Sequence, residues 1–242
     1  YTLRTLFPYT TLFRSCIQVC SKEEWSSLKE LFKDIEYKTN MSPFGELMRI
    51  KLYDKECIFY YSGETKTKSS AACQFAIDNW NPKIIIVLGT CGGVDEKLNV
   101  LDVIIANKTV QYDCIDRMGT KPYVFYEPLT TIIDNSWIHF NEFSGQVYEG
   151  IIATADQDVN YEVLHMLRKE SVLCADWESG SIAYICSLNK VNNCIVRGVT
   201  DIPTQNIEES ANNQGTDYRG NTPKVMKKLI ENVLPVLFRN ML

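Results

Sequence analysis

The sequence lacks the features that mark several classes of protein. None of its apolar runs approaches the roughly 18 residues that a membrane-spanning helix needs, so we expect no membrane span. It has no long basic run and its net charge is -5, which makes nucleic acid and anionic membranes poor candidate partners. Its two histidines, His139 and His165, lie in unrelated contexts. We therefore expect no zinc site, no Ser-His-Asp triad, no metal and no cofactor.

The cysteines lack the pairing that disulfides or metal sites need. There are 9 of them, scattered singly and without a CxxC pair. An odd number of isolated thiols is typical of small buried apolar side chains in a reducing compartment. We therefore expect free cysteines and a cytoplasmic protein.

The first residues differ in character from the rest of the chain. Residues 1–15 contain the near-repeat TLFPYT and TTLFRS, and they lack the regions of a signal peptide. They look like translated adapter sequence, and an amphipathic anchor is a weaker alternative because their apolar residues keep no helical period. We expect residues 1–15 to be a non-native leader and residues 16–242 to form one domain, which is an ordinary size for an α/β fold.

Residues 171–203 have the pattern of a strand, a helix and a second strand. Residues 172–175 and 194–199 are short apolar runs, and Ile182, Ile185 and Leu188 recur between them at helical spacing. Asn192 and Asn193 are expected to end the helix. This pattern predicts a β-α-β unit with two parallel strands and a right-handed crossover.

Two acidic residues follow the strands of this unit. Glu178 comes just after the first strand and Asp201 just after the second. In open α/β sheets, ligands bind at the carboxyl edge of the strands, so both carboxylates would face one crevice. The alternative is structural: Glu178 would be a first-turn acid favoured by the helix dipole, and Asp201 an ordinary turn residue.

Two earlier motifs also stand out. Ser21 and Glu24 have the spacing of a capping box that opens a helix, which is the structural role expected for Glu24. Residues 83–88 form the most apolar run, typical of a central strand buried on both faces. Gly89-Thr90-Cys91-Gly92-Gly93 follows at once, and it either exposes backbone N–H groups to a ligand or is only a tight turn.

The remaining pattern predicts further elements. Residues 47–52 and 56–61 suggest a hairpin, 67–80 and 161–169 suggest helices, and 150–154 suggests a strand. Residues 101–106 and 109–112 are two strands or one bent strand. The polar stretch after Pro203 is either a lid or partly helical, and Thr222-Pro223 is expected to begin the C-terminal helix.

These motifs together resemble those of a known superfamily. ADWESGSIA followed by VRGVTD is similar to the VEMEGAAIA and VRAISD motifs of purine nucleoside phosphorylases and nucleosidases, and IIIVLGTCGGVDEKLNVLDVIIA to their IINTGSAGGL…VGDVVVS segment. The resemblance extends from Ile17 to the C-terminus and is greatest to 5′-methylthioadenosine/S-adenosylhomocysteine nucleosidases. It implies a three-layer α/β domain whose central sheet is mixed, mostly parallel and twisted, with flanking helices.

The resemblance also implies a site and an activity. Asp201 matches the acid that engages purine N7, and Glu24, in SKEEW, falls where nucleosidases have the Glu that activates water. Glu178 matches the residue that holds the ribose hydroxyls. The other positions implied to bind substrate are Thr90, Cys91, Gly92, Val159 and Trp177. The implied reaction is hydrolysis of the N-glycosidic bond of a purine nucleoside, as in methionine salvage, by a cytoplasmic homodimer.

The chemistry of this reaction needs these residue types. Cleavage passes through an oxocarbenium-like sugar, and the purine leaves well only when a ring nitrogen is protonated, which a desolvated Asp201 could support. A second carboxylate, Glu24, would deprotonate water on the opposite face, as in inverting glycosidases. The carboxylate of Glu178 would accept hydrogen bonds that strengthen as charge develops on the sugar.

Some residues depart from the family pattern and leave alternatives open. Asp158 stands where nucleosidases usually place an aromatic residue against the base, and Trp177 replaces a smaller Met. Adenine specificity and the 5′-methylthio preference are therefore open. A phosphate-dependent phosphorylase and a non-catalytic nucleoside-binding relative are the alternatives, but the turn at Gly63-Glu64 carries an acid and no arginine, and Glu24 would repel phosphate.

Overall fold

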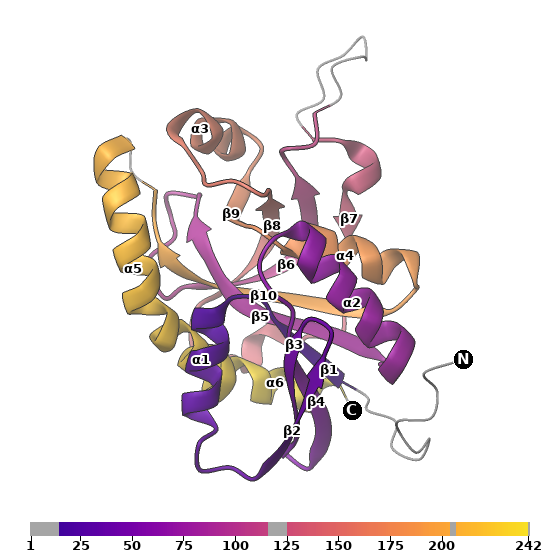
Figure 1. Ribbon diagram of the computed structural model, residues 1–242. Helices are drawn as coiled ribbons and strands as arrows, with labels where there is room; N and C mark the ends of the chain where they lie inside the picture. The colour runs from indigo at the N-terminus through magenta and orange to yellow at the C-terminus, as the bar shows by residue number, and fades with distance from the viewer. Residues whose placement is uncertain (1–14, 116–124, 204–206, 242) are drawn as a thin grey trace.

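The computed structural model describes residues 15–115, 125–203 and 207–241, and backbone alone over 207–214 (Figure 1). The predicted leader lies outside these residues except for Ser15, which is the first residue of β1. The strands are β1 (Ser15–Val19), β2 (Tyr37–Ser42), β3 (Gly45–Leu52), β4 (Lys55–Tyr61), β5 (Ile84–Gly93), β6 (Val103–Gln111), β7 (Thr131–Ile132), β8 (Val147–Thr154), β9 (Val172–Asp176) and β10 (Asn192–Asp201).

The helices connect these strands or follow the last of them. They are α1 (Lys22–Leu31), α2 (Lys66–Trp80), α3 (Tyr161–Lys169), α4 (Ser179–Leu188), α5 (Ile207–Lys228) and α6 (Leu234–Asn240), with short 3-10 turns η2 (Glu127–Leu129) and η3 (Phe140–Glu142) and a π-helical turn η4 (Leu229–Val233). The predicted capping box begins α1, since Ser21 Oγ accepts from the Glu24 amide at 3.1 Å.

All the strands belong to one mixed sheet that partly closes on itself. The order is β10-β6-β8-β9-β5-β1-β4-β3-β2, and β10 also pairs with β5. The strands β5, β10, β6, β8 and β9 thus form a closed ring, and β1, β4, β3 and β2 extend from it. Five of the pairings among the described strands are parallel and five are antiparallel, and the two longest are the parallel pairs β10–β5 and β6–β8, so the sheet is mixed as predicted.

The core lies on both faces of this sheet. Alternate residues of β5 point to opposite sides, as strand geometry requires. Ile84, Ile86 and Leu88 pack in a cluster with α1, α5 and α6, whereas Ile85 and Val87 pack with α2 and α4. Figure 1 shows these two groups of helices on either side of the strands. β5 is therefore buried on both faces, which explains its unbroken apolar run.

The predicted parallel pair is wrong. β10 runs parallel to β5, but β9 runs antiparallel to it, and the two strands of the predicted unit do not pair with each other. β9 instead lies beside β8, and it touches β5 only where Gly92 faces Ala175 and Gly93 faces Cys174. Periodicity in one segment carries no information about which strands become neighbours. The carboxyl ends still meet, because β9 and β5 overlap only through their last residues.

Two boundaries also differ from expectation. Asn192 and Asn193 do not end the helix, since α4 ends at Leu188; they begin β10 and pair with Ile84 and Ile85. The C-terminal helix begins at Ile207 and not at Thr222-Pro223, so Pro223 lies inside α5. A proline there costs roughly 3 kcal/mol, and burial of Val225, Met226 and Leu229 against the sheet offsets it.

Other expectations are confirmed. β3 and β4 form the antiparallel hairpin, with Tyr53 and Asp54 at positive φ in its turn. β6 is one strand with a register irregularity after Ala106. Eight of the 9 cysteines are buried, as expected of small apolar side chains, and Cys114 is partly exposed.

The contact between β10 and α5 predicts a stability effect. A Cβ at Gly198 would lie 2.4 Å from Val225 Cγ1, too close without a backbone shift. We expect Gly198→Ala to lower the free energy of unfolding by about 1–3 kcal/mol, measured by urea denaturation. Gly145→Ala is the control, since a Cβ there meets nothing within 4 Å; equal effects of both changes would contradict this packing.

Candidate active site

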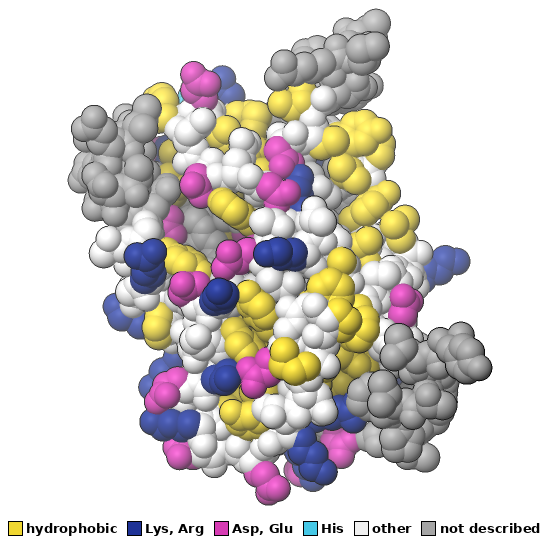
Figure 2. Space-filling model, in the orientation of Figure 1, with side chains coloured by type: hydrophobic (Ala, Val, Ile, Leu, Met, Phe, Trp, Pro, Cys, Tyr) yellow, Lys and Arg dark blue, Asp and Glu magenta, His cyan; other side chains and the backbone are white. Residues whose placement is uncertain are grey.

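One cavity of about 650 Å³ brings together all eight predicted site residues, namely Glu24, Thr90, Cys91, Gly92, Val159, Trp177, Glu178 and Asp201. The carboxyl ends of β5, β9 and β10 form one part of its wall, and the start of α1, the loop before α3 and one side of α5 form others, together with Glu64 and Tyr112. Figure 2 shows acidic side chains, in magenta, gathered on this face between α1, α3 and α5. Segments far apart in the sequence thus share one site.

Glu24 is buried, with 2% of its surface exposed, and both carboxylate oxygens accept hydrogen bonds. Oε2 accepts from the backbone amide of Ser21 at 3.0 Å and from that of Cys20 at 3.3 Å. Oε1 accepts from the amide and the hydroxyl of Thr90 at 2.7 and 2.8 Å. The expected capping role is therefore real, and the same carboxylate also reaches the glycine-rich end of β5.

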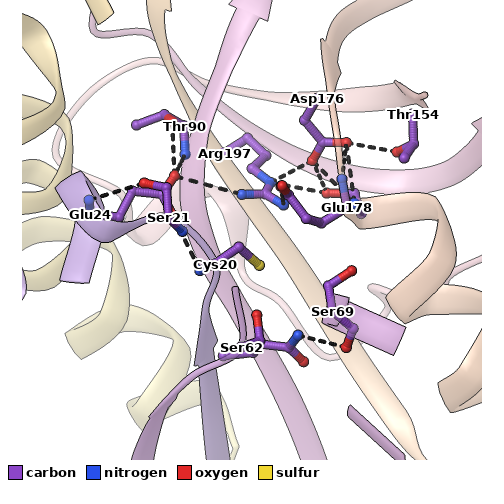
Figure 3. Close-up of polar contacts among 12 residues, drawn as sticks. Cys20, Ser21, Glu24, Ser62, Ser69, Thr90, Thr154, Asp176, Glu178 and Arg197 are labelled. Carbon is purple, nitrogen blue, oxygen red and sulfur yellow. Dashed lines mark hydrogen bonds and ion pairs between the residues drawn. The ribbon is translucent and has the colours of Figure 1, made fainter. Parts of the chain in front are cut away.

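Arg197 is completely buried. Figure 3 shows it between Glu24 on one side and Asp176 and Glu178 on the other. Its Nε lies 2.7 Å from Asp176 Oδ2, its Nη2 3.3 Å from Glu178 Oε2, and its Nη1 3.9 Å from Glu24 Oε1. A buried guanidinium needs such partners, because transfer of an unpaired charge from water is costly. One cation thus links the acids of α1 and of the β9–α4 turn.

A glycine makes room for this arrangement. A Cβ on Gly89 would lie 2.1 Å from Arg197 Nη1 and 2.7 Å from Glu24 Oε1. No side chain fits there, so Gly89, the first glycine of the predicted turn, lets the backbone of β5 lie close to Arg197 and Glu24.

Glu178 and Asp176 sit close together at the end of β9. The Thr65 amide donates to Glu178 Oε1 at 3.3 Å, and the Thr154 hydroxyl donates to Asp176 Oδ1 at 2.6 Å. Burial raises the pKa of Glu178 to about 8, Arg197 acts in the lowering direction, and the negative charges of Asp176 and Glu24 add to the rise. Three carboxylates around one guanidinium thus favour retention of a proton on Glu178.

Asp201 ends β10 on the other side of the cavity. The Thr200 hydroxyl donates to its Oδ1 at 2.7 Å. Burial raises the pKa of Asp201 to about 6, and the charges of Asp217 and Asp158 act in the same direction. A carboxyl group of this kind carries a proton over a larger part of the physiological pH range than an exposed one.

Aromatic residues also line the cavity. Trp177 lies there as predicted, and Tyr112 and Tyr218 join it. The Tyr218 hydroxyl donates to Ser21 Oγ at 2.7 Å, which ties α5 to the start of α1. Asp158, in the position expected to be aromatic, also faces the cavity.

Sequence reasoning missed Arg197, Asp176 and Tyr218 as parts of the site. The signal for Arg197 was a lone arginine inside the apolar run of β10, where a charge must find a buried partner. Asp176 was visible only as one member of an acidic cluster. Tyr218 lies in a polar stretch whose helical period is weak, so nothing in its spacing pointed to the cavity.

The described residues give two further findings. In residues 15–115, 125–203 and 207–241, no group of three or more His, Cys, Asp or Glu side chains is placed to hold a metal ion. No helix in this part of the chain combines the length and apolar character needed to cross a membrane.

The chain matches known proteins over most of its length. The family model described as the phosphorylase superfamily matches residues 14–235. The 5′-methylthioadenosine/S-adenosylhomocysteine nucleosidase of Staphylococcus haemolyticus is 25% identical over 206 residues, which are 78% of this chain and 86% of that protein. The nucleosidase of the same name from a Geobacillus species is 29% identical over 166 residues, 63% and 70% of the two chains.

Solved structures show the same fold. A Helicobacter pylori nucleosidase variant with 5′-methylthioadenosine in its active site superposes with a TM-score of 0.76 and 20% identity, covering 93% of this chain and 98% of the other. The futalosine hydrolase of Helicobacter pylori superposes with a TM-score of 0.76 and 20% identity, covering 94% and 98%.

The raised pKa of Glu178 predicts how stability varies with pH. The folded protein holds this proton more tightly than the unfolded chain. The free energy of unfolding that this proton contributes is therefore complete at low pH and is lost as pH rises toward about 8. Between pH 6 and 8 we expect a loss of at least about 1.4 kcal/mol, equivalent to one pKa unit. Urea denaturation at several pH values measures it. Glu178→Gln should flatten this dependence, and an unchanged slope in that variant would contradict the assignment.

Proposed function

This chain belongs to the phosphorylase superfamily, and we propose that it is a nucleosidase, which hydrolyses the N-glycosidic bond of a purine nucleoside such as 5′-methylthioadenosine or S-adenosylhomocysteine. The products are the free base and a ribose derivative. The observation that carries the proposal is the meeting of Glu24, Glu178 and Asp201, from three distant segments, in one cavity. The names of the curated relatives support the choice of substrate.

Asp201 is proposed as the general acid toward the base. Its pKa of about 6 lets part of the population hold a proton near neutrality, and that proton can be shared with a ring nitrogen of the leaving purine. Val159 and Asp158 line the same cavity from the loop before α3. Because Asp158 cannot stack on a ring, Tyr112 and Trp177 are the aromatic side chains proposed to contact the nucleoside.

Glu178 is proposed to hold the ribose hydroxyls. Its Oε1 accepts from a backbone amide and its Oε2 from Arg197, which leaves acceptor capacity on the carboxyl group toward the cavity. Positive charge that develops on the sugar makes the ribose hydroxyls better donors, so their hydrogen bonds to Glu178 strengthen in the transition state. Thr90, Cys91 and Gly92 border the same part of the cavity.

Glu24 is proposed to receive a proton from the attacking water. The Nη1 of Arg197 lies 3.9 Å from Glu24 Oε1 and has no hydrogen-bond acceptor among the described residues. The guanidinium thus lies beside the carboxylate to which the attacking water would transfer its proton. The Thr90 hydroxyl, which donates to the same oxygen, can rotate to accept from that water.

Water is favoured over phosphate as nucleophile by the charge of the cavity. Its described lining includes seven acids, Glu23, Glu24, Glu64, Asp158, Asp176, Glu178 and Asp201, and a single basic residue, Arg219. Even with protons on Glu178 and Asp201, the other five acids outnumber the single arginine, so Coulomb repulsion in a partly desolvated site works against a dianionic nucleophile. Arg197 is already paired with three of these acids.

We further propose that the protein acts as a cytoplasmic homodimer. Free, buried cysteines fit a reducing compartment. Ile115, after β6, and Ile132, in β7, have 56% and 73% of their surface exposed and are apolar side chains that a second copy could cover. Sedimentation of the purified chain tests this assignment: a monomer at micromolar concentration would contradict it.

Product analysis tests the proposed reaction. Incubation with 5′-methylthioadenosine, S-adenosylhomocysteine, adenosine and inosine should release free base from at least one of them in phosphate-free buffer. A strict dependence on added phosphate would identify a phosphorylase. Binding without release of base from any of the four would favour a non-catalytic relative and contradict the proposal.

The role of Asp201 predicts both a variant effect and a pH profile. Asp201→Asn should lower kcat by about 100-fold or more, because the amide cannot supply the proton. The wild-type kcat/KM should fall as pH rises through about 6, where Asp201 loses its proton. Asp78→Asn, which removes an exposed carboxylate on α2 away from the cavity, is the control and should have little effect. Wild-type rates in Asp201→Asn would show that another group is the acid.

A further inference from the structure

The residue before α2 has a backbone conformation that its side chain disfavours. Thr65 has a φ of 83° and a ψ of 154°. Glycine adopts these angles readily, but they strain a residue with a Cβ, and a β-branched residue most of all. The Thr65 hydroxyl makes no capping hydrogen bond to the helix. Other contacts of this segment must therefore offset the strain.

The backbone N–H of Thr65 has a partner in the proposed active site. It donates to Glu178 Oε1 at 3.3 Å, and Arg197 Nη2 donates to Oε2 of the same group at 3.3 Å. The two donors hold both oxygens of Glu178 and so fix the plane of its carboxyl group. If Thr65 relaxed to negative φ, the peptide unit that carries this N–H would turn relative to α2.

Lys66, the first residue of α2, is held through both its backbone and its side chain. Its amide donates to Asp156 Oδ1 at 2.8 Å, and its Nζ donates to Asp113 Oδ1 at 2.5 Å. The Asp156 amide donates to Asp113 Oδ2 at 3.0 Å, which closes the network. The side chains of Lys66 and Asp113 are only 19% and 21% exposed, so solvent screens this ion pair less than a surface pair. These three residues are named the Lys66 clamp.

The Lys66 clamp joins the start of α2 to two loops of the sheet. Asp113 follows β6, and Asp156 follows β8. The loop after β8 continues into Asp158 and Val159, which line the cavity. The clamp thus fixes the peptide before α2 against a loop that borders the proposed site of the base.

We propose that Lys66, Asp113 and Asp156 are positioning residues, which hold Thr65 at positive φ so that its N–H meets Glu178. The three do not belong to the described lining of the cavity, so they act through the backbone and not by touching the nucleoside. The inference rests on the proposed function for its catalytic consequence, because Glu178 is the residue proposed to hold the ribose hydroxyls. The hold on the backbone can be tested without activity.

Removal of the lysine charge tests the clamp in the reaction. Lys66→Met keeps the length of the side chain and should lower kcat/KM about tenfold, the size expected for loss of one buried hydrogen bond. Lys66→Arg keeps the ion pair and should stay within about threefold of the wild type. Lys68→Met, which removes an exposed charge from the same end of α2, is the control. Equal effects of Lys66→Met and Lys68→Met would overturn the inference.

A second substitution, at position 65, separates positioning from a general loss of stability. Glycine adopts positive φ without strain, so addition of Thr65→Gly to Lys66→Met should raise kcat/KM at least about threefold. Thr65→Ala keeps a Cβ and its penalty, so it should give no recovery in the same background. Equal rates of the two double variants would overturn the inference.

Hydrogen exchange of the backbone amide at position 65, followed by NMR, needs no substrate. This amide should exchange about tenfold faster in Lys66→Met than in the wild type, because the local contact opens more often. Addition of Thr65→Gly should restore the protection, and addition of Thr65→Ala should not. Unchanged exchange in Lys66→Met would overturn the inference. If Lys66→Met does not fold, Asp113→Asn breaks the same ion pair from its other end and decides by the same measurements.

Failure of the proposed function remains distinguishable from failure of this inference. A wild-type protein that releases no base from any nucleoside contradicts the nucleosidase assignment, and hydrogen exchange still decides whether the Lys66 clamp holds Thr65. An active wild-type protein whose Lys66→Met variant keeps its rate and its protected amide contradicts the clamp alone.

Discussion

A single buried guanidinium organises the site. Arg197 is surrounded by Asp176, Glu178 and Glu24, which lie on β9, on the turn into α4 and on α1. Each of these acids would be costly to bury alone, and so would the cation. Held together, they leave an excess of negative charge, which favours a proton on Glu178 and disfavours anionic nucleophiles. The chemical character of the cavity follows from this imbalance.

The partly closed sheet explains how the acids meet. β9 and β10 run in opposite directions relative to β5, yet their carboxyl ends reach the same cavity because β9 overlaps only the last residues of β5. Asp201, at the end of β10, and Glu178, just after β9, therefore line the same cavity. α1 adds Glu24 through its capping box, so one carboxylate both begins a helix and completes the site.

Much of this could be predicted from the sequence, and the misses have physical causes. Three features depend only on local sequence pattern and are present in the structure. They are the apolar run of β5, the hairpin of β3 and β4, and the capping box at the start of α1. Strand partners depend on contacts between distant segments, so the direction of β9 relative to β10 was predicted wrongly. The start of α5 was missed because packing of Val225 and Leu229 overrides the helix-breaking tendency of Pro223. The eight site residues came from motif resemblance, whereas Arg197 and Asp176 needed geometry to be noticed.

We propose that one cavity presents Asp201 to the base and Glu178 to the sugar of a nucleoside, with Glu24 on the remaining side. A crystal structure of the Asp201→Asn variant with 5′-methylthioadenosine bound would test this arrangement. We expect the introduced amide side chain within hydrogen-bond distance of a purine ring nitrogen, Glu178 bonded to the ribose hydroxyls, and Glu24 on the side of the sugar opposite the base. A nucleoside bound outside this cavity, or with its sugar away from Glu178, would show that these residues do not have the proposed roles.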